Sequence, residues 1–287
     1  MRSAHGSTPD TAGPIVLAPD LDLGGVPSLA FQPAVDLATG RLLGFEALLR
    51  WPDEQGNVIP PADVVAWAKA NGHLIPLNRW VIEEACTQAV RWPSQLQVAV
   101  NCTEFQLADQ EGAMAVVLGL QRTGLNPHRL TVEITENTVG DGTAAQDLCA
   151  MARFGIQVSV DDLTSHQPLS LDLATHAVSS VKIDGTIIAG LSEPGYLSRT
   201  IVETIIHMSH PLGISTVAEA VETHEQATLL RELGVAAAQG FFFSPPLDAA
   251  TALELASMSP LPHFDLVSAP LVDGDGAACT VMRRWLR

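Results

Sequence analysis

The stretch FQPAVDLATGRLLGFEALLRW, residues 31–51, contains two strand-like runs separated by a short turn. Both runs alternate apolar residues with small or polar ones, and the connection ATG at 38–40 is too short to hold a helix. The stretch therefore predicts an antiparallel hairpin at the start of the fold. A parallel pair would need a crossover of a dozen residues or more.

The remainder of the chain alternates short β-branched runs with longer amphipathic segments. The predicted strands are residues 29–37, 42–51, 96–101, 130–136, 156–162, 179–184, 214–221 and 236–244. The predicted helices are residues 61–72, 77–92, 112–124, 144–155, 197–213, 224–234 and 249–258, and several of them end at Gly.

Eight strands alternating with helices over roughly 240 residues predict an α/β fold of the (β/α)8 TIM-like barrel type. The opening hairpin modifies it, because one barrel strand would run antiparallel to the others. A doubly wound open sheet is the alternative, but no GxGxxG follows the first strand. Residues 1–25 and 263–287 are rich in Pro, Gly and Ala and are predicted to be extensions of a barrel domain at 26–262.

The composition excludes some classes of partner. The 287 residues are 47% hydrophobic and carry a formal net charge of −17, which argues against a sequence-independent grip on DNA or RNA polymers. No apolar run reaches the ~18–20 residues of a membrane span, so no membrane contact is expected. The N-terminus lacks the pattern of a secretory signal, and the dispersed Cys86, Cys102, Cys149 and Cys279 indicate reduced thiols. A cytoplasmic protein is predicted.

Polar side chains stand at or near the ends of most predicted strands. They are Glu46, Asn101, Glu133, Asp161, Asp162, Lys182, Glu219 and Gln239. Singly, each has an ordinary explanation as a solvated acid, a turn former or a helix cap. Together they would meet on one rim of a barrel, where crowded carboxylates raise one another's pKa unless cations share them. Oxygen ligands favour Mg²⁺ or Mn²⁺, and two such ions are a common arrangement for cleaving phosphodiesters.

At this point the motifs resemble a known family, the EAL-domain phosphodiesterases of bacterial cyclic-di-GMP signalling. The matching motifs are FQP at 31–33, EALLR at 46–50, NCT at 101–103, EITEN at 133–137, VDD at 160–162, KID at 182–184, AEAVET at 218–223 and QGFFFSPPL at 239–247. The resemblance covers roughly residues 28–250. It implies a modified barrel with one reversed strand and hydrolysis of cyclic-di-GMP to linear pGpG with two Mg²⁺ or Mn²⁺ ions. It also implies a homodimer.

The resemblance assigns roles residue by residue. Glu46, Asn101, Glu133 and Asp161 look like the ligands of one metal, and Asp161, Asp162 and Glu219 like those of the second. Lys182 resembles the lysine at the nucleophilic water, and Glu219 is a general-base candidate. Gln239 matches a glutamine near that water or the second metal, and Glu222 matches a supporting acid. Arg50 resembles the arginine on a substrate phosphate, Gln32 would lie close to a guanine, and Glu136 would anchor the loop after the paired aspartates.

That loop departs from the family pattern. Where the family reads DFGTGYSS, residues 162–169 read DLTSHQPL, so Thr164 and His166 replace two glycines. Ala220 also replaces the glycine of AEGVE, which is a smaller change. His166 is interpreted as a loop residue rather than a catalyst. Three hypotheses follow: a slow phosphodiesterase, a cyclic-di-GMP receptor with little turnover, and a barrel that acts through protein contacts. The complete ligand set favours the first.

Overall fold

A computed structural model describes residues 25–102, 111–135, 145–163, 177–192, 197–258 and 264. For residues 111, 112, 145, 162 and 192 it describes the backbone alone.

Strands and helices alternate along these residues. The strands are β1 (Ser28–Asp36), β2 (Leu42–Pro52), β3 (Val58–Ile59), β4 (Gln97–Asn101), β5 (Leu130–Thr135), β6 (Gln157–Leu163), β7 (Ser180–Ile183), β8 (Ser215–Ala218) and β9 (Ala237–Gln239). The helices are α1 (Pro61–Ala70), α2 (Leu74–Val90), α3 (Glu111–Thr123), α5 (Ala145–Arg153), α7 (Gly185–Ala189), α8 (Leu197–Ser209), α9 (His224–Leu233) and α10 (Ala249–Ala256).

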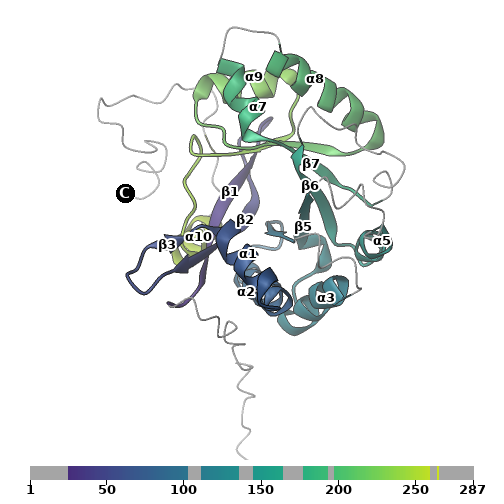
Figure 1. The fold of residues 1–287 in the computed structure, drawn as a ribbon. Coiled ribbons are helices and arrows are strands. Elements are labelled where there is room, and N and C mark those ends of the chain that lie inside the picture. Colours follow the sequence, from purple (N-terminus) through teal and green to yellow (C-terminus); the bar gives the residue numbers. More distant parts are fainter. Residues whose placement is uncertain are drawn as a thin grey trace, which may run out of the picture.

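The strands close into a barrel with helices around its outside (Figure 1). The order is β1-β9-β8-β7-β6-β5-β4-β2, and β1 pairs with β2 to complete the circle. Strand β1 is antiparallel to both of its neighbours, whereas β2 and the remaining barrel strands are parallel to one another. The predicted modified (β/α)8 barrel is confirmed, and the open sheet is not formed. Strand β3 pairs antiparallel with the end of β2, outside the barrel.

The reversed strand follows from its turn. The carboxylate of Asp36 accepts hydrogen bonds from the backbone N–H of Thr39 at 2.6 Å and from its hydroxyl at 2.7 Å. Gly40 adopts a φ of 73°, which glycine tolerates without strain, and its N–H donates to the Asp36 carbonyl at 2.7 Å. The chain therefore turns back directly after β1, as the hairpin pattern predicts.

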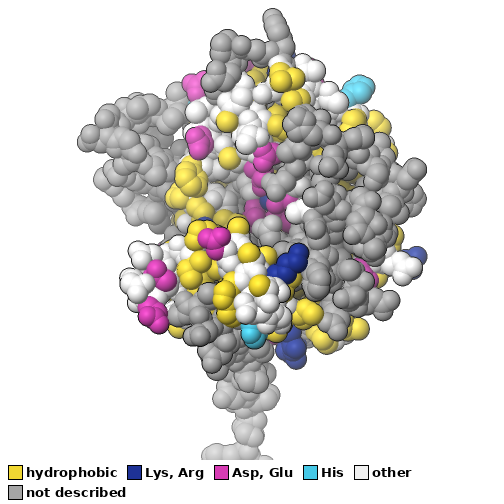
Figure 2. Space-filling view, viewed as in Figure 1, with side chains coloured by type: hydrophobic (Ala, Val, Ile, Leu, Met, Phe, Trp, Pro, Cys, Tyr) yellow, Lys and Arg dark blue, Asp and Glu magenta, His cyan; other side chains and the backbone are white. Residues whose placement is uncertain are grey.

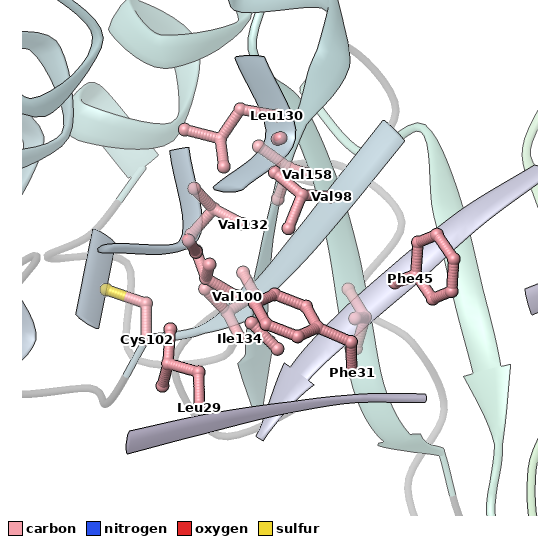
Figure 3. Packing of buried hydrophobic residues seen from close by; sticks show 14 of the residues in the cluster. Leu29, Phe31, Phe45, Val98, Val100, Cys102, Leu130, Val132, Ile134 and Val158 are labelled. Atoms are coloured by element: carbon pink, nitrogen blue, oxygen red, sulfur yellow. The ribbon is translucent and has the colours of Figure 1, made fainter. Parts of the chain in front are cut away.

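The apolar core lies between the sheet and the helices, on the outward faces of the strands (Figure 3). Val98, Val132, Val158 and Val181 are fully buried there. Because side chains alternate across a strand, the residues between these valines face the interior of the barrel. Helices thus cover the apolar face and leave the inward face for polar chemistry.

Several predictions about the whole chain stay predictions. Among residues with described placement, no helix is both long and apolar enough to cross a membrane. Cys86 and Cys102 are buried and Cys149 is partly buried, while Cys279 lies outside the described residues. The domain limits, the homodimer and the cytoplasmic location stay predictions. Phe264, inside the predicted C-terminal extension, packs edge-on against Phe243 with ring centroids 6.0 Å apart.

Candidate active site

A buried lysine forms the centre of the site. Lys182 lies on β7 with 2% of its surface exposed, and its Nζ contacts four carboxylates. The distances are 2.6 Å to Glu219, 3.0 Å to Glu133, 3.2 Å to Glu46 and 3.3 Å to Asp161. The barrel thus brings acids from four separate segments onto one ammonium group, as their positions at the strand ends predict.

The strand register explains this convergence. Asn101 on β4 is level with Glu133 on β5, and Gln32 on β1 is opposite Glu46 on β2. Each of these residues occupies an inward-facing position of its strand. Glu219 directly follows β8, and its N–H donates to the Ile183 carbonyl of β7 at 3.2 Å, so the loop continues the edge of the barrel.

Two side-chain amides orient the carboxylates. The Nε2 of Gln239 donates to Glu46 at 2.6 Å and to Glu219 at 3.0 Å, and the Nδ2 of Asn101 donates to Glu46 at 2.7 Å. Because the N–H₂ group of the Asn101 side chain donates to Glu46, the carbonyl oxygen is the atom of this amide that can act as an acceptor or ligand. These hydrogen bonds hold Glu46, Asn101 and Gln239 in place on one side of the cluster.

The protonation of the acids reflects burial and shared charge. Burial raises the pKa of Glu133 well above its usual range, against the opposing charge of Lys182. Burial also raises the pKa of Glu219 to about 7, with the charge of Asp161 adding to it. Burial of Glu46 acts in the same direction, but Lys182, Gln239 and Asn101 outweigh it and lower its pKa. Burial lowers the pKa of Lys182, yet the four carboxylates raise it well above normal.

Part of the positive charge between the acids comes from the protein itself. From the sequence, bound cations alone were expected to let the crowded carboxylates coexist. The structure shows that Lys182 supplies one shared positive charge, while burial raises the pKa of Glu133 and of Glu219. The four acids around this one ammonium carry an excess of negative charge whenever more than one of them is ionised.

A pocket of about 310 Å³ adjoins the cluster. Its lining includes Gln32, Leu48, Ala220, Glu222, Gln239 and Phe241. Acidic side chains gather in a hollow near the middle of this face of the molecule (Figure 2). Phe241 is 60% exposed, although it is a large aromatic side chain. No role follows for Phe241 from the sequence, because FFF at 241–243 reads as an ordinary apolar run; an exposed ring beside a polar pocket is visible only in three dimensions.

The loop after β8 has a strained backbone. Ala220 has a φ of 48°, and no other non-glycine residue with described placement has a positive φ. The next residue is held on both sides, because Val221 N–H donates to the Gln239 carbonyl at 3.0 Å and Phe242 N–H donates to the Val221 carbonyl at 2.9 Å. The replacement of glycine at 220 is thus more than a change of side chain, since alanine occupies a left-handed conformation between Glu219 and Glu222.

The two predicted substrate residues lie close to the cluster without joining it. The side-chain amide of Gln32 donates to the Ser244 carbonyl, which fixes this buried side chain in the wall of the pocket. Arg50, four residues beyond Glu46 on β2, is half-buried and donates to the Leu49 carbonyl at 2.9 Å. Burial lowers the pKa of Arg50, and the charge of Glu46 opposes that effect.

Other predicted site residues cannot be placed. Asp162 belongs to β6, but its side chain lies outside the described residues. Glu136, Thr164 and His166 also lie outside them, together with the rest of the altered loop at 164–169. Their predicted roles stay predictions.

The donor set fits a hard divalent cation in its chemistry. Carboxylate and amide oxygens are the ligands that Mg²⁺ and Mn²⁺ prefer, and the cluster holds surplus negative charge. Among the side chains that the structure describes, no three His, Cys, Asp or Glu residues already form a metal-ligating group. The four acids instead point at Lys182, so some of them would have to turn from it to bind a metal.

Comparison with known proteins identifies the family. A family model described as the EAL domain matches residues 22–246. The chain belongs to the EAL domain family. The resemblance read from the sequence is confirmed, and solved EAL structures share the fold of this chain.

EAL-domain relatives include sensors and phosphodiesterases. The oxygen sensor protein DosP of Escherichia coli is 34% identical over 77% of this chain, and the cyclic di-GMP phosphodiesterase PdeR of the same organism is 31% identical over 76%. A solved MucR phosphodiesterase in complex with c-di-GMP is 31% identical, with a TM-score of 0.73 over 78% of this chain and 93% of its own. The chain spans 28% of the length of DosP and 34% of that of PdeR.

Proposed function

We propose that this EAL domain hydrolyses cyclic-di-GMP to linear pGpG, with two Mg²⁺ or Mn²⁺ ions. The observation that carries the proposal is the convergence of Glu46, Glu133, Asp161 and Glu219 on Lys182 beside a pocket of about 310 Å³. The names of PdeR and of the MucR complex support the choice of substrate.

The carboxylates would divide between two metals. Glu46, Asn101, Glu133 and Asp161 would hold one ion, and Asp161, Asp162 and Glu219 the other. Bound ions of this kind lower the pKa of water and neutralise charge on a phosphate. The amide contacts of Gln239 and Asn101 would hold Glu46 and Glu219 in place in the free protein.

The remaining roles belong to the chain's own side chains. Lys182 would hold the attacking water and offset charge that develops on phosphorus, because its ammonium remains protonated in the cluster. Glu219 would accept a proton from that water as general base. Arg50 would bind a phosphate through its planar guanidinium. Glu222 would be a supporting acid behind the residues that bind the metals directly.

The pocket wall would recognise the bases. Gln32, fixed by Ser244, would face a guanine edge. Phe241 adds a residue to the predicted set: its exposed ring is available to stack on a guanine face, and such stacking contributes about 1–3 kcal/mol for each base. Glu136 would anchor the loop at 163–169.

Purified protein incubated with cyclic-di-GMP and Mg²⁺ or Mn²⁺ tests the proposal. We expect pGpG to accumulate, and chelation of the metal should stop it. Failure to form pGpG under any metal condition would reject hydrolysis.

A receptor with little turnover is the second candidate, favoured by the absence of the two family glycines from the loop at 163–169. It predicts cyclic-di-GMP binding without product. A variant with glycine at both Thr164 and His166 separates the two: faster hydrolysis identifies the loop as the limiting defect, and an unchanged rate places the limit elsewhere. Absence of binding would favour action through protein contacts.

A further inference from the structure

The inside of the barrel below the Lys182 cluster is open, and polar groups stand among the apolar side chains of its wall. A cavity of about 110 Å³ lies there, and Glu46, Glu133 and Lys182 close it at the end nearest the active site. The rest of the lining includes small or hydroxyl-bearing residues, namely Ala34, Ala99, Ala237, Thr131, Ser159 and Ser180. It also includes the larger Leu43, Phe45, Gln97 and Val217. We call this cavity the lumen.

The strand register places these residues on the inward face. Thr131 is level with Ala99, and Ser180 is level with Ser159, across neighbouring parallel strands. Each lies two residues before or after another inward-facing position, such as Glu133 or Lys182. The lumen is therefore a feature of the barrel itself and not of a surface loop.

Solvent reaches this inward face. Ala99, Thr131 and Ser180 are only half-buried, whereas the outward-facing Val98 and Val132 are completely buried. Barrels of this type normally fill their interior with layers of bulky branched side chains. Here the apolar packing lies outside the sheet, and the interior keeps unfilled space beside polar groups.

A space of this size with hydroxyl and charged groups on its wall favours water. A water molecule occupies ~30 Å³ of liquid, so the lumen has room for about three or four molecules, and empty cavities in proteins are characteristically apolar. Water in the lumen can bond to the hydroxyls of Thr131, Ser159 and Ser180. It can also solvate the underside of the cluster, where burial otherwise penalises several charges at once.

We propose that the lumen binds a short column of ordered water. This water enters from the end of the barrel opposite the active site and hydrates the Lys182 cluster from below. The presence of this water does not depend on the proposed hydrolysis. Its contribution to turnover does rest on the proposed function. A substrate covering the pocket would leave this column as solvent for the buried charges.

A matched pair of substitutions at Ser159 tests the column. Threonine and valine have side chains of nearly the same shape, but of the variants Ser159→Thr and Ser159→Val only the first keeps a hydroxyl. If the lumen is wet, the valine variant should unfold about 2–4 °C below the threonine variant, because valine removes a hydrogen-bonding partner of the water. If the lumen is dry, valine should be at least as stable as threonine, and that result would overturn the proposal.

A high-resolution structure of the unmodified chain provides a second measurement if a variant does not fold. We expect ordered water within hydrogen-bonding distance of the Ser159 and Thr131 hydroxyls. A lumen without such water would contradict the proposal. Hydrolysis assays distinguish failure of the water column from failure of the proposed function. Ordered water in the lumen of a protein that forms no pGpG would reject the proposed function alone. Formation of pGpG by a protein whose lumen holds no ordered water would reject the water column alone.

Discussion

Lys182 determines the electrostatics of the candidate site, because four acids share its single positive charge. Removing one partner from a buried ion cluster leaves uncompensated charge away from water, which is strongly unfavourable. The lysine therefore contributes to the stability of the metal-free protein as well as to the proposed chemistry.

Lys182→Met should destabilise the metal-free protein by about 3–5 kcal/mol, since the carboxylates lose their counter-charge. Mn²⁺ should restore more stability to this variant than to the unmodified protein, because the metal would replace the missing cation. Urea unfolding with and without Mn²⁺ measures both effects. Lys69→Met, at an exposed position of α1, is the control and should change stability by less than about 0.5 kcal/mol. Equal stability of Lys182→Met and the unmodified chain would contradict the shared-charge description.

Glu46→Ala should abolish formation of pGpG, because Glu46 accepts hydrogen bonds from Lys182, Asn101 and Gln239 and is a proposed metal ligand. The loss in rate should exceed the roughly 10–100-fold that removal of an outer contact of a metal site causes. Turnover and Mn²⁺ binding by calorimetry are the measurements. Glu203→Ala is a matched control, since that exposed acid pairs with Arg199 on α8, and its turnover should be unchanged. An unchanged rate in Glu46→Ala would remove Glu46 from the ligand set.

At the scale of elements, helix α9 fixes the loop that carries Glu219 and Glu222. Thr223 caps the helix, and the buried Gln226 completes a capping box. The Oε1 of Gln226 accepts hydrogen bonds from the N–H of Glu222 at 2.8 Å and of Thr223 at 3.1 Å. Its Nε2 donates to the Ile188 carbonyl at 3.3 Å, which links the loop to helix α7.

Gln226→Ala should therefore lower stability by about 1–2 kcal/mol, through two backbone N–H groups left without acceptors. It should also raise the KM for cyclic-di-GMP more than it lowers kcat, because Glu222 lines the pocket. Gln226→Glu keeps an oxygen that can accept from both N–H groups and should restore KM towards its original value. Thermal unfolding and steady-state kinetics of the three proteins are the measurements. A glutamate variant as impaired as the alanine variant would show that the capping contacts do not position the loop.

At the scale of the whole molecule, two buried thiols make stability sensitive to alkaline pH. Burial raises the pKa of Cys86 and of Cys102 to about 12. In the unfolded chain a thiol ionises at about pH 8.5–9, so above that pH the unfolded state loses protons that the folded state retains. This stabilising contribution is complete below about pH 9 and is lost as the pH rises towards 12.

The free energy of unfolding should fall by about 1.4 kcal/mol per pH unit for each of these thiols between pH 9 and 12. Urea unfolding at pH 8 and pH 10 measures the fall. Cys86→Ala should lose about 1.4 kcal/mol less than the unmodified chain over this range, since one of the two groups is gone. An identical pH dependence in both proteins would mean that Cys86 ionises as readily in the folded state as in the unfolded one.

Alternation within the parallel strands shows how much of the site the sequence contains. QVAVN, LTVEIT and QVSVDDL place polar or small residues at every second position, although parallel strands covered on both faces usually read as continuous apolar runs. The pattern carries the signal for a polar barrel interior. Recognising it depends on knowing that helices cover only the outward faces.

Local patterns alone determined the barrel, its reversed first strand and the acids at the strand ends, because strand alternation and turn length act over a few residues. Tertiary structure decided which acids meet on Lys182, the left-handed backbone of Ala220, the exposed ring of Phe241 and the open lumen. These features depend on register between strands that are distant in the chain. Their energies come from burial and from charges brought together only when the barrel closes.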